Sequence, residues 1–294
     1  MRVDPQYVNN LTGALDQVTA NQDSLSEELS SGMRVNSLGG DPVAAGQNVL
    51  LNSQLSLDDT FSQTADSAES MLQVSDSALG DVVTQLTKAI SLATEANTGT
   101  LDASQISDIG TQLSGIRDEV IALANTTYLG QSIFAGSQGS SAAYSSTGTY
   151  QGDTIVSYVE TPNGQKIQLN VPGSQIFSAG GTSDVMAVLN SLVSDFSSGT
   201  VSSSAVADAS ALNTALNYVS GQRTIIDNSI TRLQTSASYS ETEATNLESS
   251  QTSLLQADVG QVSTQLSLAE SQESALASTI AAIDKEGSLF SYIQ

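Results

Sequence analysis

Both ends of the chain carry apolar residues at helical spacing. The N-terminal stripe, interrupted by the polar Gln22, comprises Val8, Leu11, Leu15, Val18, Leu25 and Leu29. The C-terminal stripe, interrupted by Glu273, comprises Leu255, Val259, Val262, Leu266, Ala269, Leu276, Ile280 and Ile283. Stripes of this width form seams between helices rather than thick cores. We therefore predict two helical arms that pair with each other or with neighbouring copies, and these residues as their assembly interface.

A loop with distinct stop and start signals follows the N-terminal arm. Gly32 is suited to close the first helix in the left-handed conformation. Asp41 and Pro42 then mark a new helix, because a carboxylate caps exposed amides and proline has no N–H to leave unpaired at that position. The loop between these signals contains Arg34, one of only 8 basic residues. Two interpretations of Arg34 remain open: an inter-domain or inter-subunit contact with a carboxylate, or a solvated loop arginine.

The next segment has a long heptad register. Apolar residues fill two heptad positions from 42 to 96, with Asp58 and Ser75 as polar exceptions. At 1.5 Å per residue this helix would be about 80 Å long. A break at residues 98–100 and a second apolar stripe from residue 106 predict an antiparallel helical hairpin that ends near residue 127.

The middle of the chain has a different pattern. Residues 136–152 are rich in Gly, Ser, Ala and Tyr and have no helical periodicity. Residues 155–160 and 166–171 read as two strands around a turn, and residues 185–196 as a short helix. A small β-containing insert is therefore expected between the helical segments.

A final helical region begins near residue 204. Its heptad phase slips by one residue between Leu254 and Gly260, which indicates either a joint or a continuous helix whose stripe drifts. The predicted fold is mainly α, an elongated multi-domain helical rod with a small β-containing insert. Its predicted parts are an N-terminal arm at 1–36 that pairs with a C-terminal arm at 252–294, rod segments at 37–136 and 198–251 that pair with each other, and the insert at 137–197.

The composition favours narrow contacts between helices over a thick core, and it excludes several functions. Aromatic residues make up only 4% and Trp is absent. The formal net charge of -23 argues against nucleic acid and anionic membranes as partners, since few basic residues are available to neutralise phosphates. Only 13% of residues are charged, so helix faces are covered largely by neutral polar side chains on which copies can pack.

The chain lacks the usual residues of catalysis. Without His or Cys, histidine-based triads, thiol nucleophiles and most zinc sites are impossible. The acidic pairs Asp58 with Asp59, Asp76 with Asp81 and Glu241 with Glu243 are expected on exposed polar helix faces. We predict no enzyme activity, no catalytic residue, no cofactor and no metal. The first seven residues contain no apolar segment of signal-peptide length, so we expect any export to use no cleaved signal.

Several segments resemble a known family. Residues 29–37 followed by Asp41-Pro42-Val43-Ala44-Ala45 resemble the N-terminal motif of the flagellin superfamily. Residues 116–136, the insert segments 150–153 and 170–177, and the ending 288–293 are similar to the hook-filament junction members of that superfamily. Met33 and Gly40 depart from the family pattern, so a salt link in this loop would depend on Arg34 and Asp41 alone.

The resemblance implies a secreted structural subunit of the bacterial flagellum. Such a subunit would be exported by the flagellar type III apparatus and would join a hook-side junction protein, another hook-associated protein, to the flagellin filament. Its implied partners are copies of itself, the hook-side protein, flagellin and a cytoplasmic export chaperone. We expect its arms to become helical on assembly, since a lone arm cannot offset the entropy of ordering about 30 residues. The alternatives are a flagellin that builds the filament itself, a cytoplasmic coiled-coil adaptor, and an enzyme within a helical bundle.

Overall fold

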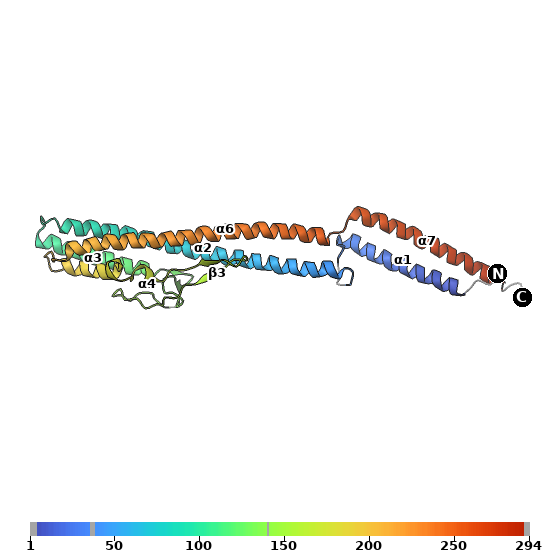
Figure 1. Ribbon diagram of the computed structural model, residues 1–294, viewed down its shortest axis with the longest axis horizontal. Helices are drawn as coiled ribbons and strands as arrows, with labels where there is room; N and C mark the ends of the chain where they lie inside the picture. Colours follow the sequence, from blue (N-terminus) through green and yellow to red (C-terminus); the bar gives the residue numbers. More distant parts are fainter. Residues whose placement is uncertain (1–4, 36–38, 140, 291–294) are drawn as a thin grey trace. The chain divides into compact units, whose positions relative to one another are not determined.

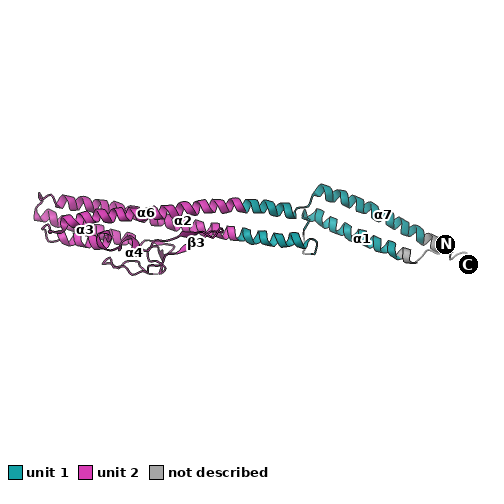
Figure 2. Ribbon diagram, viewed as in Figure 1, with its two compact units in different colours: residues 1–56, 244–294 teal, residues 57–243 magenta. Residues whose placement is uncertain are grey.

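The computed structural model describes residues 5–35, 39–139 and 141–290; the side chains of 5–8 and 284–290 are outside this description. The described chain is mainly α-helical (Figure 1). It forms two compact units, residues 1–56 with 244–294 and residues 57–243 (Figure 2). The prediction of a mainly α protein with a small β-containing insert is confirmed.

The first unit contains helices from both ends of the chain. Helix α1 (Pro5–Ser31) lies beside α7 (Val259–Phe290), and the unit also holds the beginning of α2 (Pro42–Ala96) and the end of α6 (Ala205–Leu255). Helix α6 ends before α7 begins, so the phase slip seen in the sequence is a joint and not a drifting stripe.

The second unit is a helical bundle around one apolar core. It contains most of α2 and α6, together with α3 (Ala103–Ala124) and α5 (Val185–Phe196). The heptad register of α2 is confirmed by burial: Phe61, Ala65, Leu72, Leu79, Val82, Leu86, Ala89, Ala93 and Ala96 are all buried. The facing positions of α6, including Leu212, Val219, Ile226 and Leu233, are buried as well.

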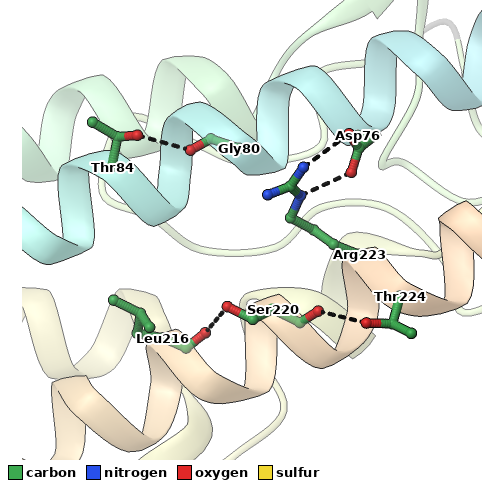
Figure 3. Close-up of polar contacts among 7 residues, drawn as sticks. All are labelled: Asp76, Gly80, Thr84, Leu216, Ser220, Arg223 and Thr224. Atoms are coloured by element: carbon green, nitrogen blue, oxygen red, sulfur yellow. Dashed lines mark hydrogen bonds and ion pairs between the residues drawn. The ribbon is translucent and has the colours of Figure 1, made fainter.

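An ion pair fixes α6 against α2 inside the second unit (Figure 3). The Arg223 guanidinium donates to both carboxylate oxygens of Asp76, with Nε–Oδ1 and Nη2–Oδ2 distances of 2.8 and 2.9 Å. This hydrogen bonding raises the pKa of Arg223. Bidentate pairing of this kind is geometrically specific. The guanidinium lies over Gly80, about one helical turn along α2 from Asp76.

The acidic pairs expected on exposed faces need two corrections. Asp76 is engaged by Arg223 and its side chain is only 25% exposed. Asp58 is 1% exposed, and neither of its carboxylate oxygens has a hydrogen-bond partner. Asp58 shares the heptad position of Ala65 and Leu72, which face the core. The helix therefore buries the Asp58 side chain although it is polar. The prediction of an exposed face was therefore wrong at these two residues.

The two strands predicted in the insert are shorter than the sequence suggested. Strands β3 (Tyr158–Glu160) and β4 (Lys166–Gln168) form an antiparallel hairpin. The predicted strands extended further at 155–157 and 169–171. Beyond the hairpin the Leu169 N–H still donates to the Ser157 carbonyl at 2.9 Å. The Ser157 N–H, however, donates to Oδ1 of the Asn170 side chain at 2.7 Å, so regular backbone pairing ends there.

A second hairpin, β1 (Thr127–Tyr128) with β2 (Gln131–Ser132), was missed by the sequence analysis, which continued the helix to residue 127. Helix α3 ends earlier because Asn125 pairs with the backbone of Tyr144 through both of its amide atoms. The hairpin turn holds Leu129 at a φ of 50°, an uncommon conformation for a residue with a side chain.

Short helices complete the insert. Helix α4 (Gly173–Ile176) and a 3-10 turn, η1 (Gly181–Ser183), precede α5. The aromatic rings of Phe134, Tyr144, Tyr150 and Phe177 pack together beside them, mostly edge to face. Burial raises the pKa of Tyr144 above its usual range. This aromatic cluster anchors the insert to the helical core.

Candidate assembly surface

The two arms share a small core within the first unit. Leu25 of α1 is buried together with Val262 and Ala269 of α7 and with Ala257, which lies just before α7. Val18, Leu29 and Leu266 pack against this group and are only partly buried. The structure thus brings the two predicted stripes together within one chain.

Most of the predicted interface residues remain partly exposed. In α1 these are Leu11, Leu15, Val18 and Leu29, and in α7 they are Leu266, Leu276, Ile280 and Ile283. Val259, predicted in the same stripe, is 51% exposed. Leu255 ends α6 and so is not part of α7. Val8 lies in α1, but its side chain is outside the described residues, as is the end of the predicted motif at 291–293.

Backbone hydrogen bonds join the end of α1 to the segment between α6 and α7. Gly32 takes the predicted left-handed conformation, with φ of 69°, and its N–H donates to Glu28. The Arg34 N–H then donates to the Leu255 carbonyl at 2.7 Å, and the Ala257 N–H donates to the Gly32 carbonyl at 2.9 Å. Sequence reasoning paired the two arms but did not predict these backbone hydrogen bonds, because contacts between segments over 200 residues apart leave no local signal.

The side chains of Arg34 and Asp41 reinforce the same joint. An Arg34 guanidinium nitrogen lies 3.0 Å from a carboxylate oxygen of Asp41, and a second donates to the Leu254 carbonyl at 3.1 Å. The other Asp41 oxygen caps α2 by accepting from the Ala44 N–H at 3.0 Å, and Pro42 is the first residue of that helix. The backbone hydrogen bond from Ala44, followed by Arg34, lowers the pKa of Asp41.

Of the two interpretations of Arg34, the structure shows a contact with a carboxylate. The carboxylate belongs to Asp41 of the same chain. The pair is solvent-accessible, with side-chain exposures of 46% for Arg34 and 32% for Asp41. Exposed pairs of this kind contribute little to stability by themselves. Their effect here is positional, because one guanidinium links the start of α2 to the end of α6.

Neutral amides extend this contact along α2 and α6. The Gln251 side-chain nitrogen donates to Oδ1 of Asn48 at 2.7 Å and to Oδ1 of Asn52 at 2.9 Å. These contacts contain no charged group and show how neutral polar side chains join helices in this protein.

The described residues contain no group of three or more His, Cys, Asp or Glu arranged to hold a metal ion. Over the same part of the chain, we find no helix with both the length and the hydropathy needed to cross a bilayer. The surfaces with a clear physical role are instead the α1–α7 pair and the joint at its base.

Comparison with known proteins shows which proteins the chain resembles. Residues 6–139 match the bacterial flagellin N-terminal helical region. A solved structure from Vibrio parahaemolyticus, of a protein assigned as flagellar hook-associated, superposes with a TM-score of 0.65. It covers 73% of this chain and 99% of its own at 19% identity, which establishes a shared fold.

Two relatives make the match more specific. Flagellar hook-associated protein 3 of Salmonella typhimurium is 32% identical over 189 residues, which are 61% of this chain and 57% of the relative. The Escherichia coli protein of the same name is 31% identical over 161 residues, 52% of this chain and 49% of its own. The chain is thus similar in sequence to flagellar hook-associated protein 3 and spans about half the length of these relatives.

Proposed function

We propose that this protein is a non-enzymatic structural subunit of the bacterial flagellum that joins the hook-side junction protein to the flagellin filament. The observation that carries the proposal is the α1–α7 pair, whose apolar stripes remain partly exposed after the two helices have packed together. A continuous stripe of partly exposed apolar residues is a surface that contact with another protein would cover. Homology to hook-associated protein 3 supports the identity of the assembly.

The proposed partners are other copies of the chain, the hook-side junction protein and flagellin. An export chaperone that holds the C-terminal arm in the cytoplasm is a further proposed partner. The expectation that the arms become helical only on assembly stays a prediction. In the structure a single chain holds both helices against each other, and the surface that remains for a neighbour is the partly exposed portion of each stripe.

Deletion of the gene in a flagellated strain tests the junction role. We expect cells that retain hooks and release flagellin monomers into the medium, with filaments restored by the full chain. Normal filaments in the deletion strain would contradict the proposal. Long filaments grown by the purified protein alone would favour the alternative, a flagellin.

Substitution of partly exposed arm residues tests the assembly surface. The double variant Leu11→Gln with Leu15→Gln should retain its helical content but lose assembly, because these two partly exposed residues lie outside the small core shared by α1 and α7 and would contact neighbouring copies. The control, Ile225→Gln, changes a residue of α6 that is 43% exposed and should assemble normally. Sedimentation velocity of both purified variants provides the measurement.

A further inference from the structure

The beginning of α2 has an apolar outer face that nothing in the described chain covers. Val43 and Leu50 are each 71% exposed and lie seven residues apart, so both project from the same side of the helix. Val49, at the flank, is 64% exposed. The inner side of this stretch is occupied, since Ala44 is only 3% exposed. The outer face is therefore separate from the surface that packs within the chain.

Gly46 lies between Val43 and Leu50 on this outer face. A Cβ placed on Gly46 would have no atom within 4 Å, so packing within the chain does not require a glycine there. Glycine is also the least favourable helix residue after proline. Its presence is explained if another backbone approaches the helix at this point, because a missing side chain permits close contact.

The charge pattern indicates which partner fits this face. Residues 42–57 contain no Asp, Glu, Lys or Arg, whereas the whole chain has a net charge of -23. Copies of such an acidic chain repel one another wherever their carboxylates approach. An uncharged helix face is where two copies meet with the least repulsion, and its exposed valine and leucine side chains gain from burial there.

We propose that the outer face of α2 around Val43, Gly46 and Leu50 is a docking surface for a helix of a second copy of this chain. Gly46 admits the backbone of the neighbouring helix between the two apolar side chains. This surface is separate from the α1–α7 pair. The inference depends on the proposed function in one respect, because it requires that copies of the chain assemble.

The variant Gly46→Ala, in the full chain, separates this role from a structural one. We expect its melting temperature to equal or exceed that of the wild type, because alanine favours helix. The protein concentration at which half of the chains are assembled, measured by sedimentation velocity, should rise about tenfold. A change of this size is expected from the loss of one interface contact of ordinary strength. The control is Gly221→Ala in α6, where a Cβ likewise meets nothing within 4 Å. It should leave assembly unchanged.

A second matched pair tests the apolar side chains. Val43 and Val206 are each the second residue of a long helix, with exposures of 71% and 67%. Val43→Ser should weaken assembly and Val206→Ser should not. Wild-type assembly of both Gly46→Ala and Val43→Ser would overturn the proposal, as would equal weakening by the two controls.

The failure of this inference can be distinguished from failure of the proposed function. If the arm variant fails to assemble while Gly46→Ala and Val43→Ser both assemble normally, α2 is not a docking surface and the arm proposal stands. If Gly46→Ala keeps self-association but loses binding to purified flagellin, the partner is a different protein and the second-copy assignment is wrong. Weakened self-association in Gly46→Ala with a normal arm variant supports α2 and contradicts the arms.

Discussion

At the scale of single residues, the polar exceptions in the apolar pattern determine local behaviour. Arg34 and Asp41 organise the joint between the arms and the adjoining helices, because one guanidinium contacts both a carboxylate and a distant carbonyl. Asp58 has the opposite character. It occupies a core position and has no hydrogen-bond partner in the described structure.

The Asp41 carboxylate makes the joint sensitive to acid. Its folded-state pKa is lowered, so its stabilising contribution is complete above the ordinary carboxylate pKa of about 3.9 and is lost as the pH falls through the folded-state value. We expect Asp41→Ala to lower the melting temperature by a constant amount between pH 7 and 5. The difference should shrink below about pH 4. Circular dichroism melts across this range measure it, and a difference that persists at pH 2 would contradict the argument.

Removal of the Asp58 carboxylate should stabilise the second unit. A buried polar group without a partner costs roughly 1–3 kcal/mol, so Asp58→Leu should raise the free energy of unfolding by about that amount. The adjacent and exposed Asp59 provides the control, and Asp59→Leu should change stability by less than about 0.5 kcal/mol. Urea titration of both variants checks the prediction. Equal effects would show that burial of Asp58 is not the cause.

At the scale of elements, helix packing depends on where small residues allow close approach. Helix α3 meets the end of α5 at Gly110, where an added Cβ would lie 3.0 Å from the Phe196 carbonyl carbon and 3.1 Å from its oxygen. These are backbone atoms, which cannot move aside by changing a rotamer. The same helix carries Gly115, where a Cβ would meet nothing within 4 Å.

The two glycines of α3 should therefore respond in opposite ways to alanine. Gly110→Ala should destabilise the protein by roughly 1–2 kcal/mol, since the cost of overpacking exceeds the gain in helix propensity. Gly115→Ala should stabilise it by up to about 1 kcal/mol. Chemical denaturation of the two variants gives the comparison. If Gly110→Ala stabilises the protein, α5 must be able to move away from α3 without a loss of stability, and the packing argument is contradicted.

At the scale of the whole molecule, charge controls how copies approach one another. Residues 5–31 and 259–283 contain acidic residues and no Lys or Arg. Assembly through α1 and α7 must therefore bring like charges together, while apolar contact favours association. The balance between these two effects depends on ionic strength, because salt screens exposed charges.

Salt should promote assembly. Raising NaCl from about 0.1 to 1 M shortens the screening distance from about 10 to 3 Å and should lower the concentration needed for assembly. The variant Glu27→Gln with Glu28→Gln should show a smaller salt dependence, since it removes two repelling charges. Light scattering against concentration measures both proteins. An unchanged salt dependence in the variant would indicate that salt acts on apolar contacts alone.

The sequence by itself determined the helices and most of their buried faces. Heptad spacing predicted the apolar positions of α2 and α6, and Gly32, Asp41 and Pro42 predicted where α1 stops and α2 starts, because these signals act over one or two helical turns. The phase slip indicated a possible break before α7 but could not distinguish it from a drifting stripe.

Only the tertiary structure decided which residues of the distant segments meet. It paired Arg223 with Asp76, joined Gly32 to Ala257, and ended the strands early at Asn170. It also buried Asp58, which sequence reasoning placed on an exposed face. These outcomes depend on packing between residues far apart in the chain, where local propensity carries no information and the register of neighbouring helices decides which side chains are covered.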